Sequence, residues 1–180
     1  MLLAEDETDL LLFPLLRAAW AKRGHPRAVL LSGHNARRVV FGTLNLRTGH
    51  RLLEVRNRHH QEDFQAFLDL VRWHYRSWHV ALLVDEQGGH IAGQTVALAE
   101  ELDIELVGLP KRAPELNPMD QLWGHAKRQI SANVQYGTIE DHVDCFLDYL
   151  QGLSPREALR KAGVLSDNFW LKDVVSPYLL

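Results

Sequence analysis

The sequence predicts an α/β fold: a mixed β-sheet in which an antiparallel meander precedes parallel strands, with helices on both faces. Three observations predict it. Short β-rich runs separated by turn signals occupy the first third of the chain, as expected of a meander. The apolar period then changes from two residues to three or four, which indicates a helix. Beyond that point strand-like and helix-like segments alternate, which is typical of parallel strands joined by helices.

The meander comes first. Met1–Glu7 is predicted to be part of a strand, Asp9–Phe13 is a second apolar run, and residues 16–24 form a helix-like or irregular basic stretch. Gly33 and Gly49 lie in the turn signals that separate the runs after it. The β-rich runs are Arg27–Ser32, Arg38–Leu46 and His50–Val55.

The central part alternates between helix and strand. An amphipathic helix is predicted over Gln61–Trp78, where apolar side chains recur every three or four residues. A strand then ends abruptly at Asp85. Asn117 is a good N-cap and Pro118 a favoured first residue, so a helix is expected to begin there and run to about Ala132. Between them, a helix and a strand are predicted at Ile91–Leu102 and Ile104–Leu109.

The last part of the chain is predicted to be helical. Apolar residues lie in helical register over Ile139–Leu150. Ser154 followed three residues later by Glu157 forms a capping box for another helix, which Gly163 is suited to end. The order of all these elements is the ribonuclease H-like arrangement.

Composition bounds the class of protein. The 180 residues fit one domain, with a core over about 1–132 and a helical C-terminal extension over about 133–180. The formal net charge of −3 is not that of a strongly basic nucleic-acid binder, although bases cluster locally. The single Cys145 excludes an internal disulfide and a Cys-based zinc cluster. With no apolar run near ~20 residues and no secretory signal, we expect a cytoplasmic protein without a membrane partner.

Three acids stand where strands end or a helix begins: Asp6, Asp85 and Asp120. Residues 86–119, 34 in number, separate the second acid from the third. In a ribonuclease H-like sheet the first strand lies beside the strand that follows the first long helix. Asp6 and Asp85 are therefore expected to be neighbours, with Asp120 approaching from its helix. Strand alternation places Asp6 on the face opposite Glu5 and Glu7.

Three carboxylates at close range repel one another and are tolerated mainly when they share cations. Oxygen ligands without cysteine select Mg²⁺ or Mn²⁺ rather than zinc. Two such ions about 4 Å apart activate a water or a 3′-hydroxyl and stabilise the leaving oxygen of a phosphodiester. The chemistry expected is phosphodiester cleavage and strand transfer.

Three motifs resemble those of the DDE/DDD transposases, in particular the bacterial insertion-sequence branch of the mariner-type superfamily. They are DET from Asp6, VDEQGGH from Val84, and LPKRAPELNPMDQLW from Leu109. That branch usually has a His five residues after the second acid, matched here by His90. The resemblance implies that Asp6, Asp85 and Asp120 are catalytic metal ligands for two Mg²⁺ or Mn²⁺ ions. It also implies DNA partners, the transposon ends and the target, and a nucleoid-associated homodimer assembled on DNA.

The sequence departs from the family in two places. Glu86 stands where relatives often carry Asn. The helix-turn-helix region that precedes this domain in full-length relatives is absent from the 180 residues, so a separately encoded helix-turn-helix subunit is one expected partner. The alternative is an inactive or truncated transposase fragment that acts only in nucleic-acid binding or assembly. A nuclease of the same fold acting on RNA–DNA hybrids or junctions is a third possibility.

Several other residues have two interpretations. His90 either orients a ligand or touches substrate phosphate, or else caps its helix locally. Glu7 is interpreted as an accessory or solvated acid, and Trp123 as a core residue rather than a platform for bases. Basic pairs are usually solvated, but two of them flank the third acid and are therefore candidates for DNA phosphate contact. These pairs are Lys111-Arg112 and Lys127-Arg128.

Overall fold

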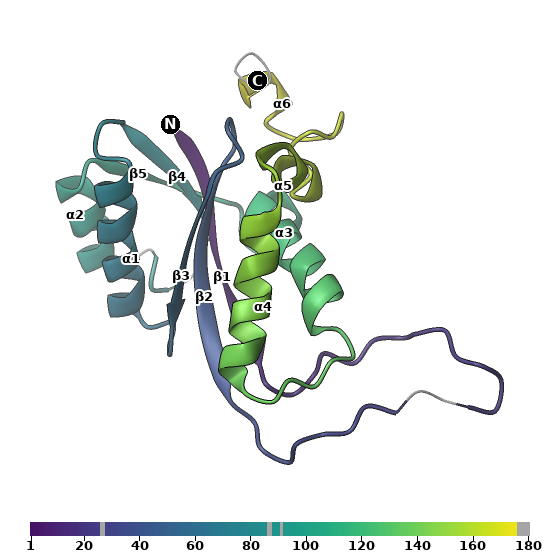
Figure 1. The fold of residues 1–180 in the computed structure, drawn as a ribbon. Helices are drawn as coiled ribbons and strands as arrows, with labels where there is room; N and C mark the ends of the chain where they lie inside the picture. The colour runs from purple at the N-terminus through teal and green to yellow at the C-terminus, as the bar shows by residue number, and fades with distance from the viewer. Residues whose placement is uncertain (26–27, 86–87, 91, 176–180) are drawn as a thin grey trace.

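A five-stranded mixed sheet forms the centre of the protein in the computed structural model (Figure 1). The strand order is β3-β2-β1-β4-β5, with antiparallel pairs on one side of β1 and parallel pairs on the other. The structure describes residues 1–25, 28–85, 88–90 and 92–175. The strands are β1 (Leu2–Leu11), β2 (Arg37–Asn45), β3 (Arg51–Arg56), β4 (Val80–Val84) and β5 (Ile104–Gly108).

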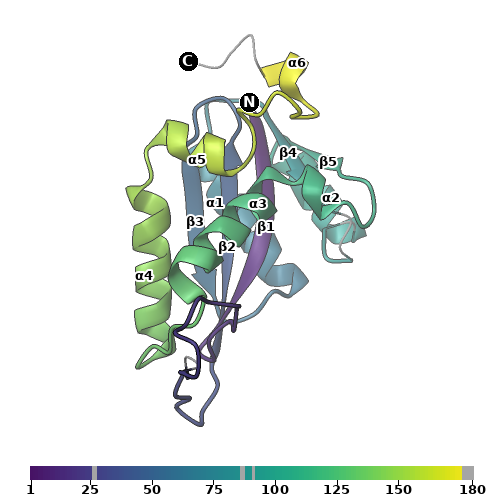
Figure 2. The same cartoon turned by 90° about the vertical axis from the view of Figure 1, so that its right-hand side faces the viewer.

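Helices cover both faces of this sheet. Helices α1 and α2 lie on one face, and α3 and α4 lie on the other, as the two perpendicular views show (Figures 1 and 2). No helix within the described part of the chain is long and apolar enough to cross a membrane. The helices are α1 (Gln61–His74), α2 (Gly93–Glu101), the 3₁₀ turn η1 (Pro114–Leu116), α3 (Pro118–Ala126), the π-helical turn η2 (Lys127–Ser131), α4 (Ile139–Gly152), α5 (Pro155–Lys161) and α6 (Lys172–Val175).

The period-two pattern of β1 divides the core into two layers. Leu3 packs with the apolar residues of α1, such as Phe67. Its neighbour Ala4 packs on the other face with residues of α3 and α4, among them Leu122 and Phe146. Because successive strand residues point to opposite faces, Asp6 shares the face of Ala4, whereas Glu5 and Glu7 share the face of Leu3.

The predicted helix starts are confirmed where capping residues were recognised. The Asn117 side chain accepts a hydrogen bond from the Met119 N–H, and Pro118 is the first residue of α3. At the start of α5, Ser154 and Glu157 form the reciprocal hydrogen bonds of a capping box. Side chains thus satisfy backbone groups that a helix end leaves without partners.

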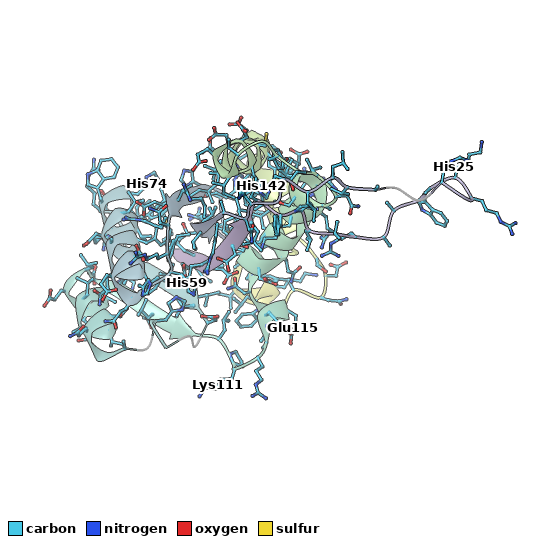
Figure 3. The ribbon with its side chains drawn as sticks, turned by 90° about the horizontal axis from the view of Figure 1, so that it is seen from below. His25, His59, His74, Lys111, Glu115 and His142 are labelled. Carbon is cyan, nitrogen blue, oxygen red and sulfur yellow. The ribbon has the colours of Figure 1, made fainter. Side chains whose placement is uncertain are left out.

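Of the two segments considered between β1 and β2, the basic stretch adopts the irregular one of its two expected forms, and the expected strand does not form. The stretch 16–24 is irregular, and the described part of Arg27–Ser32 forms no strand; Arg27 itself lies outside the described residues. Trp20 is 98% exposed and Leu30 is 86% exposed. The described residues of the segment 12–36 instead form an arm that projects from the body, with His25 near its tip (Figures 1 and 3). The prediction of regular structure in these residues rested on local sequence propensity alone.

Two boundaries also differ from prediction. Met1–Glu7 and part of Asp9–Phe13 form one continuous strand, β1. Helix α1 ends at His74, four residues before the expected Trp78, because the Arg72 guanidinium draws the chain into a turn by donating to the Tyr75 and Trp78 carbonyls. The predicted start of the next helix at Ile91 lies outside the described residues, and α2 is described from Gly93.

Candidate active site

The first two predicted acids lie on adjacent parallel strands. Ala4 of β1 is in register with Leu83 of β4. Two residues further along, Asp6 and Asp85 therefore lie at the same level of the sheet, Asp6 within β1 and Asp85 directly after the end of β4. The parallel pairing brings together two carboxylates that are far apart in the sequence.

Helix α3 carries the third acid and is tied directly to β1. Asn117, only 3% exposed, uses its Oδ1 to cap the helix and its Nδ2 to donate a hydrogen bond of 2.8 Å to the Glu5 carbonyl. Asp120 occupies the first turn of this helix, where the helix dipole favours a negative charge. One buried amide therefore sets where Asp120 lies relative to the strand that bears Asp6.

A glycine lets α3 approach the sheet closely. Gly42 of β2 pairs with Asp6 in the antiparallel register. A Cβ at this position would lie 2.6 Å from the Met119 Cε and 2.7 Å from the Trp123 ring. Trp123 is a core residue, as expected, with 1% of its surface exposed. The absent side chain of Gly42 thus makes room for the helix that carries Asp120.

The three acids line one cleft of about 390 Å³. The loop between β5 and α3 forms its other wall, and Lys111 in that loop points outward into solvent at the edge of the molecule (Figure 3). Glu7 also reaches the cleft from β1. The residues that line the cleft are Asp6, Glu7, Asp85, Leu109, Pro110, Lys111, Arg112, Ala113, Pro114, Asn117 and Asp120.

Burial raises the pKa of two of the acids of the cleft, Asp6 and Asp120. Burial raises the pKa of Asp6 to about 8, with further contributions from the charges of Glu7, Asp120 and Asp85. Burial also raises the pKa of Asp120, and the nearby charge of Lys127 opposes that rise. Perturbed acids of this kind, gathered in a cleft, are typical of functional sites.

The opposite face of β1 holds a second acidic cluster that contains a base. His90, 3% exposed, packs its ring 4.2 Å from that of Phe64 in α1. Its Nε2 lies 3.1 Å from the Glu7 Oε1, and its Nδ1 lies 2.8 Å from the Asp85 Oδ1. Burial alone lowers the pKa of His90, but hydrogen bonds to Asp85 and Glu7 outweigh this effect and raise it to about 11. His90 is therefore a cation among carboxylates.

This cluster is more compact than the predicted one. Within the described residues, Glu5, Glu7 and His90 are the trio whose possible ligand atoms all lie within 4.8 Å of one another. Both ring nitrogens of His90 already face carboxylate oxygens, so the ring has no free lone pair for a metal. Glu5 is fully buried, and burial raises its pKa well above the ordinary value. His90 is thus ion-paired with Glu7 and Asp85, and Glu5 lies beside them.

Comparison with known proteins identifies the family. A model of the DDE superfamily endonuclease family matches residues 2–142. The chain belongs to this family. The family predicted from the three motifs is thus confirmed. The insertion element IS630 uncharacterized 39 kDa protein of Shigella sonnei is 26% identical over 153 residues, which are 84% of this chain and 45% of that protein.

Solved structures of the Mos1 transposase share the fold. The paired-end complex with the left transposon end has a TM-score of 0.72 at 16% identity, covering 98% of this chain and 55% of that one. The Mos1 catalytic domain has a TM-score of 0.63 at 14% identity, covering 99% and 83%. The predicted ribonuclease H-like class is confirmed. The chain spans about half the length of the Shigella sonnei protein and of the Mos1 chain in the paired-end complex.

The cleft of this DDE endonuclease domain fits a divalent cation. Asp6, Asp85 and Asp120 offer only carboxylate oxygens, which Mg²⁺ and Mn²⁺ prefer. Among the described residues, neither Asp6 nor Asp120 forms an ion pair. The Glu7 Oε2 is buried without a hydrogen-bond partner. Uncompensated negative charge of this kind is what a bound cation neutralises.

The four predicted basic residues fall in different places. Lys111 and Arg112 line the cleft, and Arg112 adopts a positive φ of 58° in the loop. Lys127 does not line the cleft, but the charges of Asp9, Asp120 and Asp6 act on it and oppose the lowering of its pKa by burial. Arg128 is exposed, and its charge acts on His125. Only the first pair borders the space between the acids.

The sequence did not reveal the contacts that Glu7 and His90 make on the face of β1 that packs against α1. Glu7 is not a solvated acid, since its side chain is 10% exposed and bonds His90. His90 does not line the cleft, and its contact with Asp85 favours the interpretation that it orients a ligand. The strand alternation that places Glu5 and Glu7 on the apolar face of Leu3 was a usable signal for a buried partner, because acids on an apolar strand face need one. Glu86 lies outside the described residues.

Proposed function

We propose that this chain is the catalytic domain of a transposase that cleaves DNA at transposon ends and joins the 3′-ends to target DNA. The observation that carries the proposal is the cleft in which the family's three acids gather, two of them, Asp6 and Asp120, without an ion-pair partner among the described residues. The chain belongs to the DDE superfamily endonucleases, and the Mos1 relatives include complexes with a transposon end and with Mg or Mn. We infer that this chain likewise takes DNA and divalent ions.

Asp6, Asp85 and Asp120 would hold two Mg²⁺ or Mn²⁺ ions. When bound, the ions would supply an activated water or 3′-hydroxyl and would stabilise the leaving oxygen. Asp6 and Asp85 are fixed by the sheet, whereas Asp120 is set by the cap at Asn117, so the ligands come from rigid elements. Loss of protons from Asp6 accompanies metal binding, because only the ionised carboxylate ligates.

The DNA backbone would enter past the loop that bears Lys111 and Arg112. Both side chains are exposed at the cleft, where guanidinium and ammonium groups suit phosphate oxygens. Lys127 lies outside the cleft lining but interacts electrostatically with Asp120 and Asp6, and Arg128 is the next residue along the chain. His90 is buried and would act on Asp85 rather than on DNA. Work on DNA would place the protein in the bacterial cytoplasm, associated with the nucleoid.

We further infer that two copies pair when the protein assembles on DNA. The arm of residues 12–36 leaves the sheet between β1 and β2 and exposes Trp20 and Leu30 almost completely (Figure 1). Exposed apolar surface of this kind marks a site of contact with another surface. A separately encoded helix-turn-helix subunit remains a second proposed partner, which would supply recognition of the transposon ends.

Nicking of supercoiled plasmid DNA in Mn²⁺ tests the proposed activity. We expect nicking that needs the ion and falls about a thousandfold in Asp85→Asn and Asp120→Asn, equivalent to roughly 4 kcal/mol. Glu115→Gln is the matched control, an exposed acid in the same loop that does not line the cleft, and it should nick normally (Figure 3). Equal nicking by the wild type and both aspartate variants would rule the assignment out. DNA binding without cleavage would identify the alternative, an assembly fragment.

A further inference from the structure

His90 bridges the first and second acidic motifs of the chain. The ring follows β4 and is fixed against Phe64 of α1. On one side its Nδ1 donates to the Asp85 Oδ1 at 2.8 Å and lies 3.1 Å from the Asp85 carbonyl oxygen. On the other side its Nε2 lies 3.1 Å from the Glu7 Oε1. A single buried ring therefore links β1 to the end of β4 through two carboxylates.

The bridge matters for Asp85 because the sheet does not itself fix the orientation of that side chain. It lies beyond the last residue of β4, and 39% of the side chain is exposed. An aspartate in such a position can rotate about its side-chain bonds, which costs entropy when it must adopt one orientation. A hydrogen bond from a buried ring to Oδ1 fixes the carboxylate and leaves Oδ2 unused by His90.

The ring, in turn, is held by Glu7. Its carboxylate is 10% exposed and lies on the face of β1 that packs against α1, so the sheet itself sets its position. Fully buried Glu5 stands beside it on the same face, and both Glu5 oxygens lack hydrogen-bond partners. The Glu7 carboxylate accepts from the Nε2 side of the ring, which fixes the ring with its Nδ1 side facing Asp85.

We propose that Glu7 and His90 are positioning residues that hold the Asp85 carboxylate in the orientation in which it receives a divalent ion. This inference rests on the proposed function, because it assumes that Asp85 is a metal ligand. Groups that hydrogen-bond to a metal ligand typically change metal affinity or activity by about 10–100-fold when they are mutated. His90 itself would touch neither the ion nor the DNA.

Mn²⁺ affinity, read from the paramagnetic resonance signal of the free ion, tests this role without requiring activity. His90→Gln keeps one donor but cannot bridge both carboxylates, and we expect it to weaken Mn²⁺ binding about tenfold. Glu7→Gln keeps an acceptor for the ring and should stay within about threefold of the wild type. Adding His90→Gln to Asp85→Asn should cause no further loss, because the residue through which His90 acts is already changed.

The outcomes distinguish the positioning role of His90 and Glu7 from the proposed function, in which Asp85 is a metal ligand. If His90→Gln lowers only the melting temperature and binds Mn²⁺ like the wild type, the ring serves packing alone and the positioning role is wrong. If Glu7→Gln loses as much affinity as Asp85→Asn, Glu7 is itself a ligand. If Asp85→Asn binds Mn²⁺ normally, the proposed function fails instead. Should His90→Gln not fold, Glu7→Ala, which leaves His90 and Asp85 in place, gives the same decision.

Discussion

Strand β1 presents Asp6 to one side of the sheet and Glu5 and Glu7 to the other, and the two sides treat their acids differently. On the side of Glu5 and Glu7, the acids lie on the face that packs against α1, where the buried base His90 pairs with Glu7 and its charge acts on Glu5. On the side of Asp6, the acids line an open cleft, and neither Asp6 nor Asp120 has an ion-pair partner among the described residues. Neighbouring residues of one strand thus contribute to two electrostatic environments.

The difference shows how a fold can hold a site that is incomplete by itself. A buried acid that pairs with a cation of the protein, as Glu7 does with His90, has its charge partly compensated within the protein, at the cost of desolvation. A cleft of acids without a cation is unfavourable until something positive enters. The sheet separates the two groups of acids. His90, which pairs with Glu7 on one face, contacts Asp85, which lines the cleft together with Asp6 and Asp120. Changes on either face should therefore have effects of predictable sign.

The largest expected effect comes from removing the base of the buried face. His90→Leu leaves Glu5 and Glu7 buried without their cation, and breaking such a pair costs about 3–5 kcal/mol. In a domain of this size each kcal/mol lowers Tm by about 2–4 °C. Thermal unfolding of the metal-free protein measures the loss.

His50→Leu serves as the control for this variant. Its ring is partly exposed and hydrogen-bonds only the neutral Tyr75 hydroxyl, so the loss should be about 1 kcal/mol. Equal destabilisation by the two variants would show that the charge of His90 contributes nothing special, and that the contrast between the faces is one of packing.

A smaller loss of stability is expected from a substitution that pushes helix α3 away from the sheet. Gly42→Ala places a Cβ 2.7 Å from the rigid Trp123 ring, and overpacking of this kind costs about 1–3 kcal/mol. Because α3 must move, DNA nicking should fall by more than the stability loss explains. Urea unfolding and the plasmid assay together measure both effects.

Gly124→Ala is the matched control on α3. There the added Cβ meets only the flexible end of Arg128, at 3.4 Å, so the substitution should stabilise the helix by about 0.5–1 kcal/mol. Unimpaired nicking by Gly42→Ala would mean that the close approach of α3 is not what places Asp120.

The acids of the cleft were predictable from the sequence, whereas their support was not. Asp85 ends an apolar run, and Asp120 follows an Asn-Pro helix start, so local chemistry marks both. The role of Gly42 depends on the register of β2 against β1 and on where α3 lies, which no local pattern specifies. The strand predicted in the arm did not form, because a local pattern does not show whether a segment meets a partner strand. The apolar runs of the arm resemble those of strands, but tertiary contact decides whether such runs pair.

The last prediction uses pH to test whether the cleft face lacks a cation. The pKa of Asp6 is about 8 in the folded protein and near 3.8 without the fold. Between these values the folded state binds a proton that the unfolded state does not, so this group makes stability fall as pH rises. Asp6→Asn removes that dependence. In the presence of EDTA the variant should become more stable relative to the wild type from pH 5 to pH 8, by about 3–4 kcal/mol at the upper end, because each pH unit in this range is worth about 1.4 kcal/mol.

Chemical unfolding of both proteins across this range measures the difference. Adding Mn²⁺ should reverse the order at pH 8, because the ion stabilises only the protein that binds it. A difference that stays constant with pH would mean that Asp6 is ionised throughout and already has a partner, and the contrast between the two faces of β1 would then disappear.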